Sequence, residues 1–157
     1  PVMELEFLPE KRFMLRALAL AREAAQAGEV PVGAVLVREG QILGEGRNRR
    51  EAGRNALAHA EIEALAAACR TAGSWRLTGA HLYVTLEPCP MCAGAAINAR
   101  ISRIVYGADD AAAGCCGTAA NLLTLPAAPR IEVFPGFFGE EASALLREFF
   151  QRLREGA

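Results

Sequence analysis

Lysine is almost absent from this chain of 157 residues, because Lys11 is the only lysine among 17 basic residues and the others are arginines. Since 18 acidic residues leave a net charge of −1, composition alone gives no support to nucleic-acid binding, which usually leaves a basic footprint. Aromatic residues make up only 6%, and no apolar run reaches the roughly 18 residues that a membrane span needs. We therefore expect no association with a membrane.

No basic segment followed by apolar residues opens the given sequence, so we expect no export signal. The five cysteines are an odd number, and two of them stand in a C-x-x-C arrangement. This favours metal binding in a reducing compartment over a disulfide scaffold, so we expect a cytoplasmic protein. The first residue is Pro1 rather than methionine, and we expect the natural start to lie upstream.

The length is that of one domain, and 52% hydrophobic with 22% charged residues favours a folded core over disorder. Apolar periodicity predicts helices over 10–27, 56–70, 88–99 and 140–155. Strands are predicted over 30–37, 42–48, 82–86, 104–107 and 131–134. Residues 108–130 resemble a loop with a short helix near 121–123. This order predicts an α/β fold of three layers, α/β/α, in which helices cover both faces of a five-stranded mixed sheet.

The starts of the second and third helices carry ordinary helix signals. Asn55 is of a type that caps a helix, and we expect it to cap 56–70. Pro88 suits the first position of the third helix. The apolar face of the second helix is expected to comprise Ile62, Leu65, Ala66 and Cys69.

Two segments combine residue types that bind a transition metal. Cys89 and Cys92 are three apart, so their sulfurs would share one face at the front of a helix, where the dipole and free N–H groups favour thiolate. Zinc is the natural cation for such soft ligands, and His59, thirty residues earlier, supplies a third ligand. A Cys₂His set is typical of a catalytic zinc that keeps its fourth position for water.

Glu61, two residues after His59, gives that water a partner. A carboxylate beside a zinc-activated water can take its proton and later deliver it to a leaving group. Residues two apart on an ideal helix differ by about 200° around its axis, so the two side chains cannot share a face. Either the metal lies off the end of the helix, or the glutamate reaches around it.

The H-x-E and P-C-x-x-C pair resembles the signature of the zinc-dependent nucleobase deaminases. More narrowly, the chain is similar to the bacterial tRNA adenosine deaminases. The similar stretches occur in the family's order and cover most of the chain: EVPVGAVLV (29–37), GEGRN (44–48), AHAEI (58–62), LYVTLEPCPMCAGA (82–95), RIVYGADD (103–110), NLL (121–123) and LLREFF (145–150).

This resemblance implies a single zinc-dependent deaminase domain over 1–157 with a cytidine-deaminase-like fold. It implies hydrolytic conversion of adenosine to inosine at the wobble position of a tRNA anticodon. His59, Cys89 and Cys92 match the ligands of one zinc ion per subunit, and Glu61 matches the proton shuttle. In this reading hydroxide attacks carbon 6 of a flipped adenine, and Glu61 passes the proton to a ring nitrogen before ammonia leaves.

The resemblance also implies substrate-binding residues and partners. Asn48 matches a residue that holds the base, and Asp110 matches one near the target ribose. The backbone from Glu29 to Val32 and the N–H of Ala60 match the wall of the pocket. The expected partners are a tRNA anticodon stem-loop and a second copy of the chain, since the family acts as a homodimer.

The chain departs from the family near the expected RNA path. Arg50 and the Asn55–Leu57 segment replace common proline-containing patterns before the histidine. Ala112 replaces a frequent basic residue, and Asp109 stands where neutral or basic residues are frequent. Arginines nevertheless gather at two places where they could contact phosphates and unpaired bases, namely Arg47, Arg49, Arg50 and Arg54, and Arg147, Arg152 and Arg154.

Other functions remain open at this point. The same zinc chemistry could deaminate a free base or nucleotide of the guanine or cytosine type. A non-catalytic RNA-binding scaffold is another possibility, although the intact Glu61 argues against it. A riboflavin-pathway deaminase fits less well, because that family spaces its cysteines more widely. A purely structural zinc would need a fourth protein ligand such as Cys69, Cys115 or Cys116.

Overall fold

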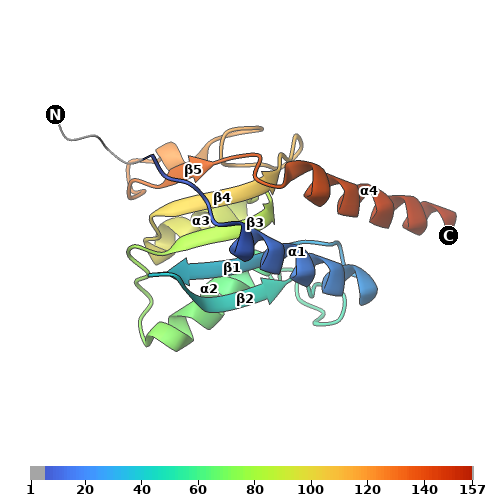
Figure 1. Ribbon diagram of the computed structural model, residues 1–157, viewed down its shortest axis with the longest axis horizontal. Coiled ribbons are helices and arrows are strands. Elements are labelled where there is room, and N and C mark those ends of the chain that lie inside the picture. Colours follow the sequence, from blue (N-terminus) through green and yellow to red (C-terminus); the bar gives the residue numbers. More distant parts are fainter. Residues whose placement is uncertain (1–5, 157) are drawn as a thin grey trace.

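The structure is a computed structural model that describes residues 6–156, and Figure 1 shows its helices and strands. The α-helices are α1 (Lys11–Gln26), α2 (Ala60–Ala72), α3 (Pro90–Ala99) and α4 (Gly139–Glu155). The strands are β1 (Gly33–Arg38), β2 (Gln41–Arg47), β3 (His81–Leu86), β4 (Arg103–Ala108) and β5 (Glu132–Phe134). A short 3-10 helix, η1, spans Leu122–Thr124.

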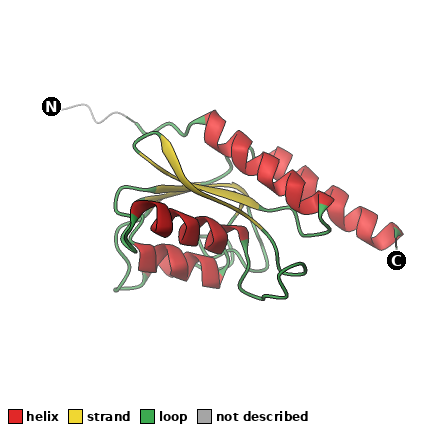
Figure 2. Ribbon diagram, turned by 90° about the horizontal axis from the view of Figure 1, so that it is seen from below, coloured by secondary structure: helices red, strands yellow, loops and turns green. Residues whose placement is uncertain are grey.

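The five strands form one mixed sheet in the order β2-β1-β3-β4-β5. Strand β1 pairs antiparallel with β2 and β3, whereas β3, β4 and β5 run parallel. Helices lie on both faces of the sheet, as Figure 2 shows, so the predicted three-layer α/β/α arrangement is confirmed. The parallel strands end at one edge, and the helix that follows β3 begins there.

Alternation along the strands divides the core into two layers, because successive side chains point to opposite faces. Leu36 and Val84 pack with α2 and α3, and the neighbouring Val35 and Tyr83 pack with α1 and α4. Near-continuous burial along β1 and β3 follows from this two-sided cover.

Two glycines of β2 let α2 lie unusually close to the sheet. A Cβ atom at Gly44 would run into the backbone of Ala64 and Ala68, and one at Gly46 would run into the backbone of Ala60 and Ala64. Only glycine allows the backbones to approach so closely. The first turn of α2, which carries Glu61, is thereby held against the end of β2.

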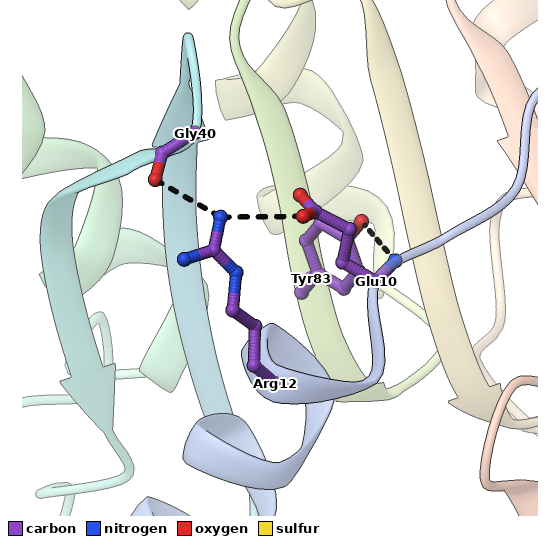
Figure 3. A network of polar contacts seen from close by, with 4 residues as sticks. All are labelled: Glu10, Arg12, Gly40 and Tyr83. Atoms are coloured by element: carbon purple, nitrogen blue, oxygen red, sulfur yellow. Dashed lines mark hydrogen bonds and ion pairs between the residues drawn. The ribbon is translucent and has the colours of Figure 1, made fainter.

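A polar network fixes the start of α1 on the other face (Figure 3). The Arg12 guanidinium donates to the Glu10 carboxylate at 3.2 Å and to the Gly40 carbonyl in the β1–β2 turn at 3.4 Å. The Glu10 N–H donates to the Tyr83 hydroxyl of β3 at 3.0 Å. These contacts join the start of the helix to β3 and to the β1–β2 turn.

The predicted starts of the second and third helices are wrong by two to four residues. Asn55 does not cap α2, because its side-chain oxygen accepts the N–H of Leu57 at 2.9 Å within a turn. His59 is the N-cap instead. Pro88 likewise precedes Cys89, the N-cap of α3, and Pro90 is the first helical residue. In both helices a predicted metal ligand occupies the cap.

Strand β1 begins at Gly33, three residues after the predicted start at 30, whereas the other remaining elements lie within one residue of their predicted bounds. The segment between β4 and β5 is mainly loop, and Asn121 caps η1 by accepting the N–H of Leu123 at 3.1 Å. Figure 1 shows α4 extending beyond the body of the sheet. Within residues 6–156, none of the helices combines the length and apolarity needed to cross a membrane.

Candidate metal centre

The ends of two helices meet at the predicted metal ligands. His59 caps α2 and Cys89 caps α3, and both residues have extended backbone, with φ and ψ of −78° and 152° and of −75° and 176°. Cys92 lies in the first turn of α3. Free N–H groups and the positive ends of both helix dipoles therefore surround the sulfurs, which favours thiolate.

The three side chains have the spacing of ligands around one ion. The Nδ1 atom of His59 lies 3.6 Å from the Cys89 Sγ and 3.5 Å from the Cys92 Sγ. A tetrahedral zinc with bonds of about 2.3 Å to sulfur and 2.0–2.1 Å to nitrogen sets such atoms about 3.6 Å apart. The donor set therefore fits zinc in both chemistry and distance.

No fourth protein ligand joins this group among the described residues. Within residues 6–156, His59, Cys89 and Cys92 form the only cluster of histidine, cysteine or acidic side chains in which three ligand atoms lie close enough together to share an ion. Cys69, Cys115 and Cys116 are free and do not belong to it. The arrangement resembles a catalytic zinc site with an open position more than a closed structural one.

The three ligand side chains lie close enough to shift one another's pKa values. A hydrogen bond from Cys92, with a further one to His59, lowers the pKa of Cys89 to about 3. The same contact raises the pKa of Cys92, and the bond to Cys89 raises the pKa of His59. A thiolate is thus already stabilised here, and a metal would replace the shared protons.

Glu61 faces the same cluster from the first turn of α2. It is only 4% exposed, and burial raises the pKa of its carboxyl group to about 7. Glu61 lies close enough to Cys92, His59 and Cys89 for these groups to shift the pKa of its carboxyl group. Two residues at this spacing could not share one face of a helix, but His59 precedes α2 instead of lying within it. The metal position therefore lies off the end of the helix.

Asn48, Ala60 and Val32 belong to one hydrogen-bonded network beside α2. The Asn48 side-chain oxygen accepts the N–H of Ala60 at 2.9 Å, and its amide nitrogen donates to the Val30 carbonyl at 3.1 Å. The Asn48 N–H donates to the Val32 carbonyl at 3.3 Å. Three of the predicted pocket residues therefore lie together at the end of β2.

The side chain of Glu29 has a structural task, and the backbone role predicted for this residue stays a prediction. Its buried carboxylate accepts the N–H groups of Glu51 and Ala52 at 3.1 and 2.9 Å. Burial tends to raise its pKa, but these bonds and the charge of Arg47 outweigh that and hold the pKa below its usual value. Glu29 thus anchors the loop that leads to His59.

Asp110 lies on the loop after β4, where its side-chain oxygen accepts the N–H groups of Ala112 and Ala113 at 3.0 and 3.1 Å. Its own N–H donates to Glu87, a buried residue two positions before Cys89. Sequence reasoning assigned no role to Glu87. The sequence did offer one signal, namely a glutamate directly after an apolar strand. A glutamate that is buried at such a position is almost always paired.

Comparison with known proteins agrees with this geometry. Residues 9–108 match the cytidine and deoxycytidylate deaminase zinc-binding region. The chain is 45% identical over 147 residues to a tRNA-specific adenosine deaminase of Bacillus subtilis, covering 93% of this chain and 91% of that protein.

Two solved structures extend the comparison. One comes from a study of A-to-I editing by tRNA:A34 deaminases at the wobble position of transfer RNA; it is 40% identical with a TM-score of 0.84, and covers 87% of this chain and 100% of that one. A guanine deaminase from Bacillus subtilis is also 40% identical, with a TM-score of 0.62, over 65% of this chain and 66% of that one. The chain therefore belongs to the zinc-binding cytidine and deoxycytidylate deaminase family, in which it groups with the tRNA-specific adenosine deaminases.

Proposed function

We propose that this protein is a zinc-dependent hydrolase that deaminates adenosine to inosine at the wobble position of a tRNA anticodon. The observation that carries the proposal is the juxtaposition of His59, Cys89 and Cys92, at the spacing of zinc ligands, with the buried carboxyl group of Glu61. Similarity along most of the chain to tRNA-specific adenosine deaminases favours this substrate over a free base.

The roles of the site residues follow from their positions. When bound, zinc supplies Lewis acidity that makes water an effective nucleophile near neutral pH. Glu61 takes a proton from the attacking water and delivers it to a ring nitrogen of adenine. It then carries the second proton to the amino group at carbon 6, so that adenosine and water become inosine and ammonia.

Asn48 is the proposed base-holding residue. One hydrogen of its side-chain amide is used by Val30, and the other can donate to the base. The network through Ala60 and Val32 fixes the amide beside the first turn of α2. Asp110, on the loop after β4, is proposed to lie near the target ribose.

Exposed arginines supply the local positive charge that the net charge does not reveal. Arg49, Arg50 and Arg54 lie exposed on the loop that Glu29 anchors, directly before His59. Arg50 is close enough to His59 for its positive charge to oppose protonation of the imidazole, which tends to lower the pKa of His59. We propose that this loop contacts the phosphates of the anticodon stem-loop, so that binding weakens steeply with salt.

We further propose a cytoplasmic homodimer. The α2 face predicted to be core is only partly covered, because Ile62 and Cys69 are half-buried and Ala66 is exposed. Trp75, beside it, is 57% exposed. An apolar face of this kind between α2 and α3 supports contact with a second copy. Sedimentation of the purified protein would show whether the dimer forms.

One assay separates the candidate functions. Ammonia release is measured with the zinc-loaded protein on an anticodon stem-loop containing a wobble adenosine, and on free adenine, guanine and cytosine. We expect release from the stem-loop only, with inosine at the wobble position. Release from guanine alone would favour the free-base deaminase suggested by the guanine deaminase likeness. No release from any substrate would favour a scaffold.

A further inference from the structure

The buried carboxylate of Glu87 gathers three hydrogen bonds from one loop. Glu87 is 1% exposed. It accepts the backbone N–H groups of Asp110 at 3.2 Å, Cys116 at 3.0 Å and Thr118 at 3.2 Å. No ion pair within residues 6–156 involves Glu87, so loop N–H groups, rather than a basic side chain, satisfy it. A buried carboxylate without such partners would be very costly.

The same loop is also fastened to the residue before a metal ligand. The Cys115 N–H donates to the Pro88 carbonyl at 2.8 Å. Pro88 stands between Glu87 and Cys89, the N-cap of α3. We define this loop as residues 110–118. Glu87 and Pro88 therefore hold it directly against the turn that presents Cys89. His59 and Cys89 are only half-buried, so this loop lies at the rim of a cluster that solvent reaches.

Gly114 makes the close approach possible. A Cβ atom at Gly114 would run into the Glu87 carboxylate and would lie 2.6 Å from the Asp110 carbonyl oxygen. The hydrogen bonds draw the loop toward the Glu87 carboxylate, and the missing side chain at Gly114 leaves room for the loop to come this close.

We propose that Glu87 is a positioning residue for the deamination, holding loop 110–118 beside the metal ligands as a wall of the substrate site. The inference rests on the proposed function, because it assigns the loop to the binding of that substrate. Glu87 touches neither the metal cluster nor the substrate and acts through the loop. Its loss should therefore weaken substrate binding while leaving the metal and the chemical step in place.

Two variants displace the loop, one by changing the acceptor Glu87 and the other by changing the loop itself. Glu87→Gln keeps the size of the side chain but turns one acceptor oxygen into an amide donor that faces N–H groups. Gly114→Ala leaves the carboxylate and pushes the loop away. Glu39→Gln is the control, since Glu39 is exposed in the β1–β2 turn, beside the start of β3 and so at the other end of the sheet from Cys89.

Zinc content and steady-state kinetics on the anticodon stem-loop are measured for each variant. We expect KM to rise about tenfold or more for Glu87→Gln and Gly114→Ala, with one zinc per chain and kcat within about twofold of the parent. Glu39→Gln should match the parent. If Glu87→Gln does not fold, Gly114→Ala still tests the position of the loop.

An unchanged KM in folded, zinc-loaded variants with a lower melting temperature would overturn the proposal, because Glu87 would then be merely structural. Loss of zinc together with activity would also overturn it. A parent protein that is inactive on the stem-loop but active on guanine would instead refute the proposed function. The KM ratios for guanine would then decide the positioning role separately.

Discussion

The side-chain oxygen of Asn48, at the end of β2, accepts the backbone N–H of Ala60, at the start of α2, at a distance of 2.9 Å. Ala60 lies between His59 and Glu61, so this bond fixes the backbone between a metal ligand and the proposed proton carrier. The amide nitrogen of the same side chain holds Val30. One buried side-chain amide thus links the segment before β1, the end of β2 and the first turn of α2.

Replacing Asn48 with alanine should therefore harm both stability and activity. The buried Ala60 N–H would lose its partner, which costs about 1–3 kcal/mol, whereas the Val30 carbonyl would still accept the N–H of Val32. Urea unfolding of the zinc-loaded protein measures the loss, and inosine formation measures activity. Asn98→Ala, at an exposed position on α3, is the matched control. Equal stability of the two variants would contradict the role assigned to Asn48.

Glu61→Gln should abolish turnover without removing the metal. The amide keeps the shape of the buried side chain but can no longer accept and return a proton, so we expect kcat to fall about 10²–10⁴-fold. Zinc content should stay at one per chain, because Glu61 is not among the three clustered ligands. Glu63→Gln, in the same turn of α2, controls for the lost charge. Near-normal turnover of Glu61→Gln would refute the proposed mechanism.

Cys92→Ala should lose zinc, whereas Cys116→Ala should keep it. Both cysteines are buried, but only Cys92 lies within the group of three ligands. Removing one of three protein ligands weakens the site, and the protein also loses the stability that metal binding contributes. Zinc content after dialysis and the melting temperature are the measurements. Stoichiometric zinc in Cys92→Ala would show that the ion is held elsewhere.

The metal cluster was open to prediction from sequence because its chemistry lies in residue types and short spacings. Histidine and two cysteines at this separation have few other uses, and the structure brings them within bonding distance of one ion. The catalytic role of Glu61 stays a prediction until turnover is measured. The strands and the order of elements were equally visible, because apolar runs bounded by turn residues are local signals.

The parts that sequence reasoning missed depend on distant segments. Asn55 has the residue type of a helix cap, but the chain uses it in a turn so that His59 can occupy the cap and face the cysteines. Glu29 and Glu87 are buried by loops that lie more than twenty residues away from them. No local pattern shows which loop will return to a given carboxylate.

Glu29 predicts a specific dependence of stability on pH. Its pKa in the folded protein is below its usual value, so the carboxylate contributes stability above its unfolded pKa, and that contribution is lost as the pH falls through the folded pKa. Near neutral pH, Glu29→Gln should be less stable than the parent by about 1–3 kcal/mol, because two backbone N–H groups lose a charged acceptor.

The difference between parent and Glu29→Gln should shrink as the pH falls below the ordinary glutamate pKa of about 4.3, because the parent then loses the same carboxylate. Urea unfolding near pH 7 and at about pH 4 measures the change. Glu51→Gln, which removes a charge from an exposed side chain of the anchored loop, is the control, and it shares any acid-induced loss of zinc. A gap that stays constant with pH would show that the charge of Glu29 does not hold the loop, leaving side-chain shape as the cause.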